Sequence, residues 1–238
     1  MKKVLLLGAS GLIAPHIIPG LEPHYDLKLA DIKPHPDGKP VETVDVTDYN
    51  QVLEAARGMD ILMNWTVLRH DDTLSFKVNT IGAFHVMKAA AELGIKKVLH
   101  TGPSQVLISH YDHDFGIPDE PVTPTTDYYF VTKYLSNEIV KSFARTHEIH
   151  TICYLFQGLR NRPEGPMTGR DFPVFTIIYD DLVHAVKLAL ELESVPDYYQ
   201  QFNLHSHLGQ NKYSIEKARR LLGYEPQERY TDLYKRTP

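Results

Sequence analysis

The amino-acid sequence predicts an α/β protein with a doubly wound parallel sheet, because short apolar runs alternate with segments of helical periodicity along most of its 238 residues. The runs Val-Leu-Leu-Leu at 4–7 and Ile-Leu-Met at 61–63 contain no alternating polar positions. Strands buried on both faces have this uniform pattern, whereas strands with one solvent face alternate. We therefore expect parallel strands covered by helices on both sides.

The individual elements follow in regular order. Strands are expected at residues 4–7, 27–30, 41–46, 61–66, 97–101 and 151–156, with helices at 12–21, 49–57, 71–93 and 127–146 between them. Pro15 can lie in the first turn of the first helix, where its missing N–H has no partner. Pro19 falls in the interior of that helix, so we expect the helix to be short or bent.

The alternation is interrupted after residue 156. A stretch rich in glycine, proline and arginine at 157–173 precedes a helix at 180–193, a strand at 201–204 and a helix at 214–222. The sequence thus indicates a core of residues 1–156 and a small C-terminal cap of residues 157–238. The cap is expected to pack on the core within a single structural domain.

Bulk composition excludes several classes of protein. The hydrophobic fraction of 42% and charged fraction of 23% are typical of a soluble globular protein. A net charge of −5 gives no basic field for nucleic acid, and no Lys/Arg block suggests a membrane surface. The N-terminal apolar run ends at Gly8, too early for a signal peptide, and the single cysteine, Cys153, suits a reducing compartment. We expect a cytoplasmic protein without nucleic-acid or membrane partners.

A glycine-containing segment, Gly-Ala-Ser-Gly-Leu-Ile-Ala at 8–14, follows the first expected strand and opens the first expected helix. In that context Gly8 permits a tight turn, Gly11 lets the backbone approach a pyrophosphate, and Ala14 allows the helix to pack on the strand. The helix N-terminus supplies N–H groups and the positive end of a dipole. The segment therefore predicts a dinucleotide-binding core of the Rossmann type.

An acidic residue, Asp31, ends the second expected strand, 23 residues after Gly8. A carboxylate there accepts hydrogen bonds from the adenosine ribose and repels a 2′-phosphate, which favours NAD over NADP. Lys33 weakens this discrimination. Asp45 and Val46, at the end of the third strand, are suitably located to contact the adenine. The alternative, a strand–turn–helix corner without a ligand, is disfavoured because the acid accompanies the glycines.

Tyr129 and Lys133 lie four residues apart, on one face of the helix expected at 127–146. A nearby lysine and a positively charged nicotinamide ring both favour phenolate and would lower the tyrosine pKa from about 10. Such a phenol can act as base when an alcohol is oxidised and as acid in the reverse direction, while the lysine bonds the nicotinamide ribose. The same spacing recurs at Tyr213 and Lys217, but only Tyr129 follows the fifth strand at the expected cofactor edge.

These residues together resemble the extended short-chain dehydrogenases/reductases, the NAD-dependent epimerase/dehydratase group. The resemblance extends over nearly the whole sequence. The resemblance rests on the following residues and segments: the glycine loop with Asp31 and Asp45, Asn79 in the helix at 71–93, the pair Tyr129 and Lys133, Glu138, and the segments at 179–182 and 221–226. It implies an NAD-dependent oxidoreductase or epimerase that acts on a hydroxyl of a carbohydrate-like small molecule. It also implies a homodimer formed through the helices at 71–93 and 127–146.

The resemblance implies a set of cofactor contacts along the C-terminal edge of the sheet. These residues are Gly8, Ser10, Gly11, Leu12, Ile13, Asp31, Ile32, Asp45, Val46, Asn64, Trp65, Thr66, Asn79, Tyr129, Lys133 and Phe156. The family has small residues after the fourth strand, where this protein has the larger Asn-Trp-Thr-Val at 64–67. We expect these side chains to narrow the pocket or shift the nicotinamide.

The short sequence is similar to the compact uronate dehydrogenases, which oxidise the anomeric hydroxyl of a free sugar acid to a lactone. This likeness implies an arginine for the substrate carboxylate, because a guanidinium matches that group in a bidentate manner. Arg170 is the first candidate, with Arg160 and Arg162 as alternatives. The expected substrate-binding residues are Ser104, Gln105, Gln157 and Arg170.

The sequence departs from the family where a Ser/Thr pair normally follows the fifth strand, since residues 101–104 read Thr-Gly-Pro-Ser. Either Thr101, or Ser104 after a turn at 102–103, can supply the hydroxyl that polarises the reacting oxygen. Uronate dehydrogenases have Asn and His where this protein has Pro103 and Ser104, and Leu155 replaces an arginine common in the sixth strand. The departures favour a divergent substrate and leave open a catalytically weak or inactive NAD(P)-binding sensor.

A histidine-rich segment, His-Tyr-Asp-His-Asp at 110–114, resembles a metal-ligand cluster. Metal binding requires convergent geometry, which a loop does not guarantee. We expect a polar flap over the active site and no bound metal.

Overall fold

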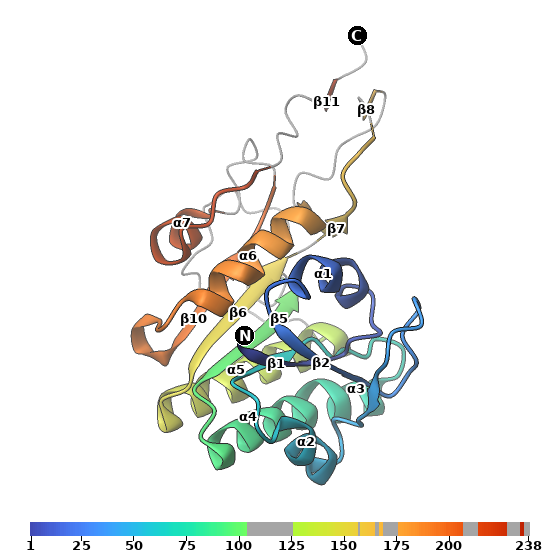
Figure 1. Cartoon of the computed structure of the whole chain (residues 1–238), viewed down its shortest axis with the longest axis vertical. Coiled ribbons are helices and arrows are strands. Elements are labelled where there is room, and N and C mark those ends of the chain that lie inside the picture. The colour runs from blue at the N-terminus through green and yellow to red at the C-terminus, as the bar shows by residue number, and fades with distance from the viewer. Residues whose placement is uncertain are drawn as a thin grey trace.

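Seven parallel strands form one sheet in the order β10-β6-β5-β4-β1-β2-β3 (Figure 1). The computed structural model describes residues 1–103, 126–156, 158–164, 167–168, 176–206, 214–227 and 234–235. The strand order reverses between β1 and β4, and doubly wound sheets bind ligands beyond the carboxyl ends of the strands at such a point. The predicted α/β class and Rossmann-type sheet are confirmed.

The strands of the main sheet lie close to their expected positions. They are β1 (Lys3–Leu7), β2 (Asp26–Asp31), β3 (Glu42–Thr43), β4 (Ile61–Asn64), β5 (Lys97–Pro103), β6 (His150–Phe156) and β10 (Tyr199–Asn203). β3 is shorter than the strand expected at 41–46, because only the last two residues of β2 pair with it. β10 pairs with β6, so the main sheet continues beyond residue 156.

Two helical layers cover the sheet (Figure 1). One contains α1 (Ala14–Leu21), α6 (Tyr179–Glu191) and α7 (Glu216–Leu222), and the other contains α2 (Tyr49–Ala56), α4 (Gly82–Leu93) and α5 (Tyr128–His147). Along β1, Val4 and Leu6 belong to the first apolar cluster, whereas Leu5 and Leu7 belong to the second. Both faces of this strand are buried, which explains its uniformly apolar sequence.

The helices that flank the expected site begin and end for local reasons. α1 is short, with a proline in its first turn and Pro19 inside it. α5 begins after Asp127, whose side chain accepts hydrogen bonds from the backbone N–H groups of Tyr129 and Phe130 at 2.9 and 3.2 Å. This N-cap defines the start of the helix that carries the tyrosine–lysine pair.

A π-helical turn interrupts the helix expected at 71–93. α3 (Asp72–Ser75) continues into the turn Phe76–Ile81, which leads directly into α4. Asn79 and Thr80 in this turn are buried. Such turns are rare inside helices and occur frequently at functional sites.

Short elements make up the rest of the C-terminal region. β7 (Gly158–Arg160) pairs with β9 (Thr176–Ile178), β8 (Met167–Thr168) pairs with β11 (Tyr234–Lys235), and the 3₁₀ helix η3 (Pro196–Tyr198) precedes β10. Figure 1 shows the β8–β11 pair at the opposite end of the molecule from α2. Within the described ranges, no helix is both long enough and apolar enough to span a membrane.

Candidate active site

Two cavities lie along the carboxyl edge of the sheet. The smaller, of about 150 Å³, is lined by the glycine loop and by residues at the ends of β2 and β3. The larger, of about 620 Å³, is lined by residues from α1 at one side and by Tyr129 and Lys133 at the other. Trp65 and Val67 line both. The two cavities together suit an extended dinucleotide, with the adenosine in the smaller cavity and the nicotinamide in the larger.

The glycine loop has a conformation that only glycine accommodates at its first position. Gly8 has φ of +85°, and a Cβ there would lie 2.7 Å from both the carbonyl carbon and the carbonyl oxygen of Trp65. The N–H of Gly11 donates to the Gly8 carbonyl at 3.1 Å, which closes the turn. The bare backbone next to the N-terminus of α1 therefore fits a pyrophosphate.

Asp31 joins this loop to the end of β2. Its carboxylate accepts hydrogen bonds from the backbone N–H groups of Ser10 and Lys33, each at 3.0 Å, while also lining the smaller cavity. A carboxylate has about four acceptor sites, so two remain for ribose hydroxyls. Asp45 accepts two bonds from Thr47 at 2.8 Å and lines the same cavity. The acids expected to contact the adenosine thus lie in one cavity.

All the expected cofactor residues except Asn64 and Asn79 line one of the two cavities. Those in the smaller cavity are Gly8, Ser10, Gly11, Asp31, Ile32, Asp45, Val46, Trp65 and Thr66. Those in the larger are Leu12, Ile13, Trp65, Tyr129, Lys133 and Phe156. Asn64 instead accepts hydrogen bonds from the N–H and the hydroxyl of Thr66, at 3.3 and 2.7 Å, and so holds the loop after β4.

Asn79 also forms hydrogen bonds with the loop after β4. Its Oδ1 accepts a hydrogen bond from Leu68 N at 2.9 Å, and its Nδ2 donates to Leu68 O at 3.0 Å. The same Nδ2 donates to the hydroxyl of Thr132 on α5 at 2.9 Å. Asn79 therefore connects the loop after β4 to the helix that carries Tyr129 and Lys133.

The Trp65 side chain packs mainly in the apolar core and not in the cofactor site. The side chain is 5% exposed and belongs to the same buried apolar cluster as Ile17 of α1 and Leu182 of α6. Its backbone remains next to Gly8. The large residue after β4 thus forms part of the wall between the cavities and packs most of its surface in the core.

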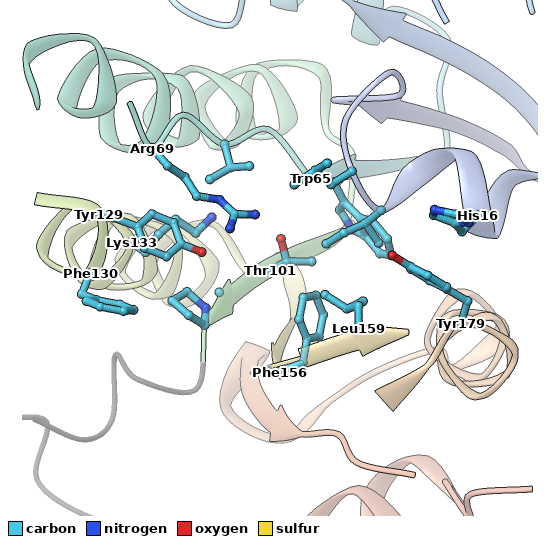
Figure 2. A pocket seen from close by; sticks show the side chains of 15 residues that line it. His16, Trp65, Arg69, Thr101, Tyr129, Phe130, Lys133, Phe156, Leu159 and Tyr179 are labelled. Atoms are coloured by element: carbon cyan, nitrogen blue, oxygen red, sulfur yellow. The ribbon is translucent and has the colours of Figure 1, made fainter. Parts of the chain in front are cut away.

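Three of the four expected catalytic residues line the larger cavity. Figure 2 shows Tyr129 and Lys133 from α5 and Thr101 from β5 around one space, with Arg69 beside them. Lys133 is 2% exposed and Thr101 is 7% exposed. The phenol, the ammonium and one hydroxyl can therefore act on the same bound molecule.

Electrostatics around Tyr129 differ from the sequence-based expectation. Burial raises the pKa of Tyr129 above its usual value, and the guanidinium of Arg69, 5.2 Å from the ring centroid, is the cation that lowers it. Burial also lowers the pKa of Lys133 to about 8. Desolvation thus makes the charged form of Lys133 less favourable, and Arg69 is a neighbouring cation that favours the phenolate of Tyr129.

β5 stays extended through Gly102 and Pro103, which pair with Leu155 and Phe156 of β6. The turn that would bring Ser104 to the reacting oxygen is therefore not formed at 102–103. Thr101 is the candidate hydroxyl within the described part of the protein. The remaining expected residues, Ser104, Gln105, Gln157 and Arg170, lie outside the described residues, as does the histidine-rich segment at 110–114.

The alternative arginines, Arg160 and Arg162, are both exposed. Arg160 is exposed on β7 and lines a further cavity with Glu164, and this cavity shares His16, Leu159 and Tyr179 with the larger one. Arg162 follows it in the same exposed stretch. Over the residues that the structure describes, no three His, Cys, Asp or Glu side chains gather in a way that could hold a metal ion.

Several lining residues were not expected from the sequence. They are His16, Arg69, Phe130, Leu159 and Tyr179. The rings of His16 and Tyr179 stack with centroids 4.0 Å apart, which joins α1 to the start of α6. Arg69 had one available signal, since it lies in the loop after β4, at the edge of the sheet where ligands bind.

Comparison with known proteins agrees with this geometry. The protein is 22% identical to a NAD-dependent glucose-6-phosphate dehydrogenase of Haloferax volcanii, over 94% of its own length and 93% of that relative. It is also 22% identical to a uronate dehydrogenase of Pseudomonas syringae pv. tomato, over 79% and 69% of the two lengths. A short-chain dehydrogenase/reductase superfamily protein from Agrobacterium tumefaciens, solved with bound NAD, is similar in structure with a TM-score of 0.82 at 17% identity, covering 98% and 94%.

A family model extends over most of the core. The model of the NAD-dependent epimerase/dehydratase family matches residues 4–159, which include the glycine loop, Asp31, Thr101, Tyr129 and Lys133. The protein therefore belongs to the NAD-dependent epimerase/dehydratase family, within the extended short-chain dehydrogenases/reductases, and its cofactor is NAD.

Proposed function

We propose that this protein is an NAD-dependent dehydrogenase that oxidises a hydroxyl of a free sugar or sugar acid. The observation that carries the proposal is the meeting of Tyr129, Lys133 and Thr101 in one cavity that adjoins the dinucleotide loop. The names of two relatives, a glucose-6-phosphate dehydrogenase and a uronate dehydrogenase, support a small carbohydrate substrate.

The residues that would hold NAD follow from the two cavities. The backbone of residues 8–13 would receive the pyrophosphate at the N-terminus of α1, and Asp31 would accept hydrogen bonds from the adenosine ribose. Asp45 and Val46 line the smaller cavity and would border the adenine, and Phe156 lines the larger cavity and would border the nicotinamide. When bound, NAD accepts the hydride released from the substrate carbon.

The protein side of the reaction is acid–base chemistry at one hydroxyl. Thr101 donates a hydrogen bond to the reacting oxygen and orients it toward Tyr129. The Tyr129 oxygen, as phenolate, takes the hydroxyl proton while the carbon is oxidised to a carbonyl, and it returns a proton in the reverse direction. Lys133 would donate a hydrogen bond to the nicotinamide ribose, and its charge would stabilise the phenolate together with that of Arg69.

The C-terminal region is proposed to form the substrate side of the site. Leu159 and Tyr179, both from residues 157–238, line the larger cavity opposite the loop after β4. Their apolar surface suits the carbon face of a sugar ring. In this role the cap closes the site around a free monosaccharide.

An absorbance screen tests the dehydrogenase assignment. Purified protein with NAD is mixed with a panel of uronic acids, aldoses, sugar phosphates and nucleotide sugars, and NADH is followed together with NMR spectra of the sugars. Production of NADH with at least one small sugar supports the proposal. A new sugar isomer without net NADH would instead assign an epimerase, and that outcome contradicts the proposed dehydrogenase.

A second candidate function is a catalytically weak NAD-binding sensor. The observation in its favour is Gly102, which lies where the family usually has a hydroxyl residue; a Cβ there would lie 3.2 Å from the Leu155 side chain, which would have to shift to admit one. This candidate predicts tight NAD binding with neither NADH production nor isomerisation across the same panel.

We also propose a cytoplasmic homodimer that pairs through α4 and α5. Exposed apolar side chains on these elements include Phe84 and Leu135, at 42% and 37% exposure, beside Ile81 at 46%. The proposal predicts a dimer mass by light scattering and a monomer mass for Phe84→Glu. A monomer mass for the unaltered protein contradicts it.

A further inference from the structure

The described lining of the larger cavity carries positive charge without a carboxylate. This described lining contains the cations Arg69 and Lys133 together with His16, and no aspartate or glutamate. The pyrophosphate of NAD belongs at the glycine loop, where backbone N–H groups receive it. Arg69 lies beside Tyr129 and apart from that loop, so its guanidinium can bind a different anion.

Arg69 is held in position through its backbone. The preceding residue, Leu68, is bonded by Asn79 at both N and O, and the hydroxyl of Ser75 also donates to Leu68 O at 3.0 Å. The hydroxyl of Tyr128 donates to the carbonyl of Arg69 itself at 2.7 Å. The loop is thus anchored on both sides of the point where the arginine leaves it.

The guanidinium of Arg69 is available to a ligand. It lies 5.2 Å from the centroid of the Tyr129 ring, and the residue is exposed. In the described portion of the protein, no carboxylate lies within ion-pair distance of it. Figure 2 shows Arg69 on the same side of the cavity as Tyr129, and His16 on the opposite side. Its position beside the reacting group, rather than at the glycine loop, favours a role with substrate over one with the pyrophosphate.

We propose that Arg69 is the substrate-anion anchor of this site, binding a carboxylate or phosphate group of the sugar while the hydroxyl to be oxidised lies at Tyr129. A guanidinium forms paired hydrogen bonds to either group, and its aromatic neighbour restricts its orientation. The inference rests on the proposed function for the position of the reacting hydroxyl. The inference goes further than the proposed function in two ways: the substrate is an acidic sugar, and Arg69 is the residue that selects it.

Equilibrium binding tests the anchor without requiring turnover. Calorimetry measures the affinity of glucuronate, galacturonate, glucose 6-phosphate, glucose and galactose for the protein saturated with NADH, a combination that cannot oxidise the sugars. The variants are Arg69→Gln, which loses the charge, and Arg69→Lys, which keeps the charge and loses the paired geometry. Arg57→Gln is the control, since Arg57 is exposed and pairs with Glu54 on the surface of α2.

The expected result is at least about 10-fold weaker binding of an acidic sugar to Arg69→Gln, with a smaller loss in Arg69→Lys. NADH affinity and the affinity for neutral sugars stay the same, and Arg57→Gln matches the unaltered protein. Preference for the uronates or for the sugar phosphate identifies the acidic group. The inference is overturned if no acidic sugar binds, if acidic and neutral sugars lose affinity equally, or if NADH binding is lost instead. Selective loss of acidic-sugar binding without any NADH production would support the anchor and refute the dehydrogenase.

Discussion

The side-chain amide of Asn79 bonds the backbone of Leu68 in both directions, accepting from its N–H at 2.9 Å and donating to its carbonyl at 3.0 Å. The same amide reaches Thr132 on α5. One buried residue, located in a π-helical turn, thus holds the loop that carries Arg69 against the helix that carries Tyr129. The geometry of the active site depends on this contact between two segments far apart in the sequence.

Asn79→Ala should weaken both the fold and the reaction. The change removes three hydrogen bonds and leaves the N–H of Leu68 without its partner, so the free energy of unfolding should fall by about 2–4 kcal/mol. Because the Arg69 loop is released, kcat/KM should fall even at a temperature where the variant is fully folded. Thr132→Val is the control, since it removes only one of the three bonds of this amide, together with the bond from the Thr132 hydroxyl to the Tyr129 carbonyl, and leaves both bonds to Leu68. Equal effects of the two variants on kcat/KM would contradict the role of Asn79 in holding the loop.

Gly8→Ala should abolish NAD binding and destabilise the protein. Positive φ and a Cβ only 2.7 Å from backbone atoms of Trp65 add backbone strain to overlap, at about 2–5 kcal/mol together. Gly58→Ala is a matched control, because Gly58 also has positive φ but has nothing within 4 Å of the added Cβ. That variant should lose only about 1 kcal/mol and keep its NAD affinity. Thermal unfolding and NADH titration measure both quantities, and similar losses in the two variants would refute the proposed close approach.

Lys133→Met should stabilise the cofactor-free protein at neutral pH and abolish its turnover. The pKa of Lys133 is lowered from 10.5 to about 8 by burial, so the charged form costs the folded state about 3–4 kcal/mol. Between pH 8 and 10.5 the unfolded state holds more protons than the folded one, so the stability of the unaltered protein receives a rising contribution from this residue. The variant lacks that contribution.

Denaturant unfolding at a series of pH values checks the lysine prediction. Lys97 also has its pKa lowered to about 8, but it is present in both proteins, so the difference between them isolates Lys133. The difference in unfolding free energy should shrink as pH rises from 8. A variant less stable than its parent at pH 7 would show that Lys133 is held by favourable contacts instead.

Arg69→Gln should shift the acidic limb of the pH profile to higher pH. The positive guanidinium favours the phenolate of Tyr129 and lowers its pKa, so removing the charge raises the pH at which the base becomes active. Arg69→Lys keeps a positive charge and should shift the limb less. The midpoint of the acidic limb is measured from the profile of kcat/KM against pH for sugar oxidation. An unshifted limb in Arg69→Gln would exclude electrostatic activation by this residue.

The parts of the site that depend on local geometry could be predicted from the sequence. The strand–turn–helix context identifies the glycine loop, and the end of the second strand locates Asp31 beside it. The spacing of Tyr129 and Lys133 places them on one helix face regardless of the surroundings. These expectations depend on short stretches of sequence, and Gly8, Gly11, Asp31, Tyr129 and Lys133 all line one of the two cavities.

The parts that depend on distant contacts could not be predicted. Asn64 and Asn79 resemble cofactor ligands in sequence, but their amides bond the loop after β4, whose course is determined by contacts from α3, the π-helical turn and α5. The same contacts bring Arg69 to Tyr129. The pKa of the tyrosine depends on burial, which spacing along one helix does not reveal. The pairing of β10 with β6 is likewise a tertiary property.

The most direct test of the central claim compares Tyr129→Phe with Tyr134→Phe on the sugar identified by the NADH screen. Both tyrosines lie on α5, but only Tyr129 lines the larger cavity. Removing the phenolic hydroxyl of the proposed base should lower kcat by about 100- to 10,000-fold with nearly unchanged NAD affinity, whereas Tyr134→Phe should keep its activity. Undiminished NADH production by Tyr129→Phe would contradict the proposed mechanism.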